Sequence, residues 1–154
     1  FALVKAGGRL LRDQGGSIVL FSSAAADVGI QNHEAIAAAK AGIVGLARSA
    51  AATYAPNNVR VNVVSPGLVR TELTRRIWDN SAAAGASREL HALGRFGEPE
   101  QIASLVVWLL DLANDWMRNA VEHTGKDGKD LIPQSPLPPT LSLDEWQKLV
   151  APDG

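Results

Sequence analysis

The residues best suited to chemistry are a serine, a lysine and a Pro-Gly segment, each beside an expected strand or helix. Ser23 ends an apolar strand-like run, and Lys40 follows in an alanine-rich helical segment. Lys40 is the only charged residue between Glu34 and Arg48, so a lysine held against a ligand is favoured over a merely solvated one. The segment 66–71 directly follows a second apolar run, at the carboxyl end of an expected strand, where open α/β sheets bind ligands. The position of 66–71 predicts a ligand site at one edge of a sheet. Ser23 taken alone is better explained as a turn serine whose hydroxyl bonds backbone groups at the strand end.

The elements that must position these residues alternate between helix and strand. Residues 34–54 are dominated by alanine, and this helix is expected to be covered on several sides, with Gly42 and Gly45 allowing a neighbour's backbone to approach. Strands separated by a helix imply a right-handed parallel crossover, so the fold class is α/β. The expected order is helix 1–13, strand 17–21, helix 34–54, strand 59–64, short helices 72–80 and 87–93, and helix 99–111.

Composition excludes several classes of protein. The chain has 154 residues, enough for one domain with a real core, and its formal charge of −1 gives no electrostatic reason to expect nucleic acid or a membrane surface as a partner. It has no cysteine, which rules out disulfides and permits the cytoplasmic location expected here. The longest strongly apolar stretch, 102–110, is far shorter than the roughly 20 residues that span a bilayer. A soluble protein is therefore expected.

The chain divides into two regions of different character. Residues 1–115 carry the helix and strand pattern, whereas 116–154 form a divergent tail. The tail has four prolines within 133–139, which favour an extended linker over regular pairing. Residues 142–145 form a capping-box pattern that predicts a short terminal helix.

Residues 1–112 resemble the C-terminal half of the short-chain dehydrogenase/reductase family. The resemblance rests on the strand and serines of 15–23 with the helix that carries Lys40, on strand 59–64, on the segment 65–71 and on 94–103. It implies a partial Rossmann-like fold, a doubly wound parallel sheet that lacks its N-terminal dinucleotide-binding half. No glycine-rich phosphate loop occurs in the chain, and the start at Phe1 is interpreted as internal, with the tail departing from the family through truncation, fusion or a changed reading frame.

The resemblance also implies catalytic roles. Ser23 matches the serine that hydrogen-bonds the substrate oxygen, and Lys40 matches the lysine that lowers the pKa of a catalytic tyrosine and holds the nicotinamide ribose. Ile36 occupies the tyrosine position and can neither donate nor accept a proton. His33 or Glu34 could replace the missing acid, although Glu34 fits equally well as a first-turn acid that complements the helix dipole.

The cofactor implied by the resemblance is NAD or NADP, and no metal site is expected. Pro66, Gly67, Val69 and Thr71 match the segment that lines the nicotinamide, together with Lys40. An isolated Pro-Gly pair would be an ordinary turn, but this one follows a buried-type strand. The segment 94–103 is interpreted as a structural loop that enters a helix.

Two functions remain open. The first is a member or fragment of an NAD(P)-dependent dehydrogenase/reductase that acts on an alcohol or ketone, with little or no turnover by this chain alone. The second is a non-catalytic oligomerisation module derived from that family, in which helices 1–13 and 34–54 join copies of the chain into a homo-oligomer. The strand 17–21, with an open apolar edge, would also favour association.

Overall fold

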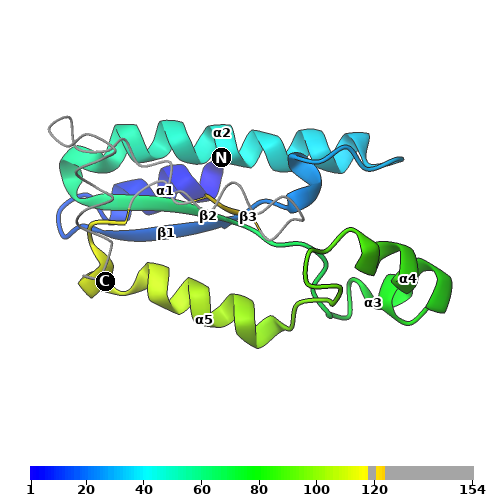
Figure 1. Cartoon of the computed structure of the whole chain (residues 1–154). Coiled ribbons are helices and arrows are strands. Elements are labelled where there is room, and N and C mark those ends of the chain that lie inside the picture. Colours follow the sequence, from blue (N-terminus) through cyan, green and yellow to red (C-terminus); the bar gives the residue numbers. More distant parts are fainter. Residues whose placement is uncertain (118–120, 124–154) are drawn as a thin grey trace, which may run out of the picture.

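The computed structural model describes residues 1–117 and 121–123 (Figure 1). Most of the predicted tail, including the linker around 133–139 and the short helix predicted from 142–145, lies outside the described residues. The described helices and strands are α1 (Ala2–Leu10), β1 (Gly16–Phe21), α2 (Glu34–Tyr54), β2 (Val59–Ser65), α3 (Arg75–Trp78), α4 (Ser81–Glu89), α5 (Pro99–Leu110) and β3 (Val121–His123). Short 3-10 turns lie at Ala24–Ala26, Ala55–Asn57 and Leu112–Asn114. The α/β fold class is confirmed.

The three described strands form one parallel sheet in the order β1-β2-β3. β1 pairs with β2 from Gly16 opposite Val59 to Phe21 opposite Val64. Figure 1 shows α1 and α2 on one face of the sheet and α5 on the other. Every residue of β2 is buried: helices lie on both faces of the sheet, β1 pairs along one edge of β2, and β3 pairs with Val63–Ser65 on the other edge. Among the described strands β1 lies at an edge, as expected from the sequence.

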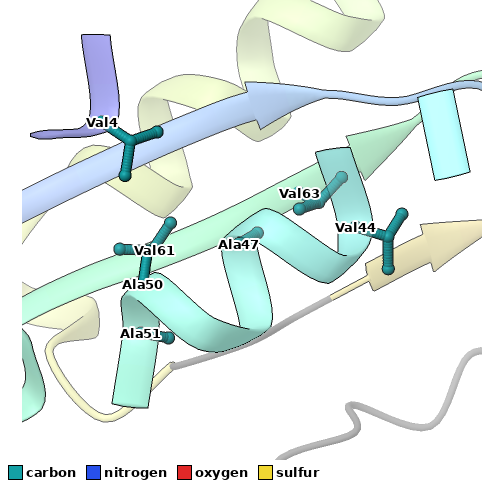
Figure 2. Close-up of a cluster of buried hydrophobic side chains, with 7 residues drawn as sticks. All are labelled: Val4, Val44, Ala47, Ala50, Ala51, Val61 and Val63. Carbon is teal, nitrogen blue, oxygen red and sulfur yellow. The ribbon is translucent and has the colours of Figure 1, made fainter. Parts of the chain in front are cut away.

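The core lies between the sheet and the helices α1 and α2. Alanines on α2 let the helix approach the valines of β2 closely, and Val4 of α1 completes the layer. Figure 2 shows the buried cluster of Val4, Val44, Ala47, Ala50, Ala51, Val61 and Val63.

Among the described residues, neighbours bury only one side of α2, which corrects the expectation that it is covered on several sides. A Cβ added at Gly42 or Gly45 would meet nothing within 4 Å, so no part of the described chain approaches either glycine. The segment Glu34–Asn57 is also long and apolar enough to cross a membrane by length and composition, which was not predicted from the sequence. One such helix is weak evidence of a membrane span, because a core helix of a soluble protein or a signal sequence passes the same test. In α2, 22% of the window is buried, on the side whose alanines pack on the sheet.

The element boundaries differ from expectation mainly between β2 and α5. Helices were predicted over 72–80 and 87–93, whereas α3 covers Arg75–Trp78 and α4 covers Ser81–Glu89. The Asn80 side chain accepts a hydrogen bond from the Ala83 N–H at 3.0 Å, so Asn80 is the N-cap that starts α4. This cap signal was overlooked in the sequence.

The strand β3 was not predicted. Its three residues follow the predicted boundary at residue 115 and pair in parallel with Val63–Ser65 of β2. The sheet therefore continues beyond that boundary. So short a strand carries no periodic apolar signal, and it is defined by backbone pairing with a distant part of the chain.

Candidate active site at the carboxyl edge of the sheet

The carboxyl ends of β1 and β2 bring two of the predicted segments together. The Ser22 N–H donates to the Val64 carbonyl at 2.9 Å, which extends the pairing of the two strands past Phe21. The Ala24 N–H donates to the Pro66 carbonyl at 3.1 Å. The loop that carries Ser23 is thus attached directly to the start of the Pro-Gly segment, as parallel neighbouring strands require.

Ser23 caps the short turn Ala24–Ala26. Its hydroxyl oxygen accepts a hydrogen bond from the Ala25 N–H at 3.2 Å. This contact is the structural role expected of a strand-end serine. The hydroxyl hydrogen is a separate donor, so the same side chain can also donate to a substrate oxygen.

Lys40 joins α2 to the end of β1 by two contacts. Its ammonium donates to the Phe21 carbonyl at 3.0 Å, and its own carbonyl accepts from the buried Ser22 hydroxyl at 2.9 Å. Lys40 is therefore held at the end of β1 by Phe21, which precedes Ser23 by two residues. It is not a freely solvated lysine. An ammonium group has three donors, and the Phe21 contact uses one of them.

The start of α2 carries Ile36 and the two residues considered as a replacement acid, His33 and Glu34. Ile36 is 46% exposed and has no group that exchanges protons. His33 stands at the N-cap, and its Nδ1 lies 2.9 Å from the Gln31 carbonyl oxygen. Since a carbonyl can only accept, Nδ1 is the donor in this contact. Glu34 lies in the first turn, where a carboxylate complements the helix dipole.

The segment that follows β2 is held mainly through its backbone. Val69 pairs with Gly97: the Arg70 N–H donates to the Gly97 carbonyl at 2.9 Å, and the Gly97 N–H donates to the Leu68 carbonyl at 3.0 Å. The Thr71 and Thr74 hydroxyls lie 3.1 Å apart. Thr74 also donates to the Val69 carbonyl at 2.5 Å. Thr71 is therefore oriented by a neighbouring threonine.

His91 binds this segment, a role that was not predicted from the sequence. The Leu68 N–H donates to His91 Nε2 at 2.8 Å, and His91 Nδ1 lies 2.7 Å from the Ser87 carbonyl oxygen in α4. The ring also packs edge-on against the buried Phe96. The only sequence signal was a histidine one turn beyond Ser87, and nothing local relates it to Leu68.

The segment 94–103 enters α5 as expected, and it also supports the segment after β2. Glu98 and Gln101 form a capping box at the start of α5. Glu98 pairs with Arg70 at 3.4 Å between Arg Nη1 and Glu Oε1. The described residues contain no group of three or more His, Cys, Asp or Glu side chains that could hold a metal ion.

Comparison with known proteins places this geometry in a family. The sequence model of the family described as "Enoyl-(Acyl carrier protein) reductase" matches residues 1–123. The solved structure of a short-chain type dehydrogenase/reductase from Mycobacterium ulcerans is 31% identical, with a TM-score of 0.73 over 77% of this chain and 44% of that one. The chain belongs to the short-chain dehydrogenase/reductase family. Its resemblance to that family in sequence and its Rossmann-like fold are both confirmed.

Relatives within the family are oxidoreductases by name. The chain is 45% identical over 96 residues to the 2,5-dichloro-2,5-cyclohexadiene-1,4-diol dehydrogenase of Sphingobium indicum, covering 62% of this chain and 38% of that protein. It is 41% identical over 103 residues to the D-threitol dehydrogenase of Mycolicibacterium smegmatis, covering 67% and 39%. A solved structure from Agrobacterium tumefaciens with bound NADP is 28% identical, with a TM-score of 0.68 over 80% of this chain and 48% of that one. The chain thus spans less than half the length of these relatives.

Proposed function

We propose that this chain forms the substrate and nicotinamide side of an NAD(P)-dependent dehydrogenase/reductase that acts on an alcohol or ketone. The observation that carries the proposal is the placement of Lys40, whose ammonium and carbonyl both bind the end of β1 beside Ser23. Ser23 would donate its hydroxyl hydrogen to the substrate oxygen. Lys40 would donate to the nicotinamide ribose.

The residues present suit one end of a dinucleotide. Lys40 supplies a cationic donor, Thr71 supplies a hydroxyl, and the backbone of Pro66, Gly67 and Val69 would line the nicotinamide. When bound, the nicotinamide supplies or receives the hydride. The printed sequence contains no glycine-rich phosphate loop between a strand and a helix, so these residues are proposed to hold the nicotinamide end only.

Proton transfer is the step for which this chain is least equipped. Ile36 stands one helical turn before Lys40, where the family has a tyrosine, and an aliphatic side chain cannot transfer a proton. Replacement of the missing acid by His33 or Glu34 stays an untested hypothesis. We therefore expect little or no turnover by the isolated chain. Robust NAD(P)H-dependent reduction of a ketone, lost in Lys40→Ala, would overturn this expectation.

A binding titration tests the cofactor proposal without requiring turnover. The purified 154-residue chain is titrated with NADH and with NADPH while nicotinamide fluorescence and molecular mass are followed. We expect saturable binding that weakens in Lys40→Ala and is unchanged in Lys5→Ala, because Lys5 is an exposed lysine of α1. Absence of binding by a folded chain, or equal losses in the two variants, would contradict the proposal.

A second candidate function is association of copies through α1 and α2. The outward side of α2 leaves Gly42 and Gly45 open, and a groove of about 250 Å³ between α1 and α2 is lined by residues that include Val4, Leu46 and Tyr54. We expect the purified chain to be a homo-oligomer by light scattering. Gly45→Arg meets no other described residue at its Cβ and should lower the mass without unfolding the chain. A monomeric wild-type chain would reject this function.

We also infer a soluble, cytoplasmic protein with a small-molecule substrate and no nucleic-acid or membrane partner. The formal charge of −1 supports this inference, as does the packing of α2 against the sheet. Fractionation of cells that produce the chain, with recovery in the soluble fraction, is the expected result, whereas recovery with membranes would refute it.

A further inference from the structure

We propose that His91 is a positioning residue that fixes the segment Pro66–Thr71 against helix α4. This role deepens the proposed function, because it concerns the segment assigned there to the nicotinamide. His91 would act through that segment and would not itself contact a ligand.

The two ring nitrogens of His91 bind two different elements. Nε2 accepts from the Leu68 N–H at 2.8 Å, so Nε2 carries a lone pair and no hydrogen. Nδ1 lies 2.7 Å from the Ser87 carbonyl oxygen and must donate to it. The contacts thus require the neutral ring with its hydrogen on Nδ1. A single rigid ring therefore joins the loop after β2 to α4.

The contact restrains the residue between two candidate cofactor positions. Leu68 stands between Gly67 and Val69, and its carbonyl accepts from the Gly97 N–H at 3.0 Å. With His91 on its N–H, both backbone polar groups of Leu68 are bonded to partners distant in sequence. Rotation of either adjoining peptide group would break one of these bonds. The backbone that would line the nicotinamide is thereby held in one conformation.

The ring of Phe96 makes a second connection between the same two elements. It packs edge-on against His91, with ring centroids 5.9 Å apart at 84°, and is only 4% exposed. The guanidinium of Arg70, from the segment, lies 5.8 Å from the ring centroid, and that of Arg88, from α4, lies 5.5 Å away. The buried ring keeps the imidazole in place, so the geometry at Leu68 is preformed.

Amide hydrogen exchange of the 154-residue chain tests the role directly. We expect the Leu68 amide to exchange about tenfold faster in His91→Ala, because it loses its acceptor. His91→Gln should restore most of the protection, since its amide oxygen can accept from Leu68 and its amide nitrogen can donate to Ser87. His33→Ala is the matched control and should leave Leu68 unchanged. Unchanged exchange of Leu68 in His91→Ala would overturn the proposal.

Three further measurements keep the proposal testable if His91→Ala alters folding. Val61 in the centre of the sheet reports whether a variant is folded, and it should stay protected. If His91→Ala unfolds, the ring nitrogen shifts of the wild-type chain decide: a neutral ring with its hydrogen on Nδ1 supports the role, and a hydrogen on Nε2 overturns it. In a binding titration, NADPH should bind more weakly to His91→Ala than to His91→Gln. A wild-type chain that binds no NAD(P)H would reject the proposed function, while Leu68 exchange would still decide the role of His91.

Discussion

The packing of α1 on α2 allows a sharp test of the structure through Gly8. A Cβ built at Gly8 would lie 2.3 Å from Cζ of Tyr54 and 2.5 and 2.6 Å from the two Cε atoms. Real contacts of this kind are essentially never below 3.0 Å, so the ring or the helix must move. Overpacking of this kind costs about 1–3 kcal/mol. Alanine is favoured over glycine inside a helix by about 1 kcal/mol. Gly8→Ala should therefore lower the free energy of unfolding by about 0–2 kcal/mol.

A control isolates the steric part of this effect. Gly85 lies inside α4, and a Cβ there meets nothing within 4 Å. Gly85→Ala should raise the free energy of unfolding by about 1 kcal/mol from helix propensity alone. The difference between the two variants, about 1–3 kcal/mol, then measures the clash with Tyr54.

Urea denaturation followed by circular dichroism at one protein concentration provides both values. The decisive comparison repeats Gly8→Ala in a Tyr54→Ala background, where the ring is absent. The substitution should then be stabilising by about 1 kcal/mol, so the two sites should couple strongly. If Gly8→Ala stabilises the chain as much as Gly85→Ala, or if no coupling to Tyr54 is found, the contact between α1 and α2 is wrong.

Three other substitutions test separate parts of the structure. Arg60 is 2% exposed and donates to the Leu109 carbonyl at 2.8 Å and the Asp111 carbonyl at 3.0 Å. Arg60→Met should therefore lower the free energy of unfolding, measured by urea denaturation, by about 3 kcal/mol. A change near zero would contradict these buried hydrogen bonds. The Ser65 hydroxyl is buried without a hydrogen-bond partner among the described residues. Ser65→Ala should therefore raise the free energy of unfolding by about 1 kcal/mol. A clear decrease in that free energy would reveal a hydrogen-bond partner of the hydroxyl. Ile36→Tyr places a phenol one turn before Lys40. The nearby ammonium should lower the pKa of that phenol below the usual value of about 10, and an ultraviolet absorbance titration would detect the shift. A phenol that titrates at the usual value would show that the ammonium is too distant.

Much of the architecture could be read from local patterns. The helix over 34–54 and the strand over 59–64 were predicted to within a residue, because their apolar spacing and the Pro-Asn turn between them are local signals. The ordered motifs also predicted the family, which the match over residues 1–123 confirms. The helix over 87–93 was placed too late because the Asn80 cap was overlooked, although that signal is local too.

The sequence by itself determined the α/β class, the family and the candidate residues Ser23 and Lys40, since each depends on residue type and spacing. Only the tertiary structure decided that Lys40 binds the Phe21 carbonyl, that His91 binds the Leu68 N–H and that β3 joins β2. It also decided which side of α2 is buried against the described part of the chain, because burial depends on what lies against a helix. These contacts join residues far apart in the chain, and their partners become neighbours only after parallel strands align their carboxyl ends. A local pattern supplies the groups that can bond, whereas the packed fold selects which of them meet.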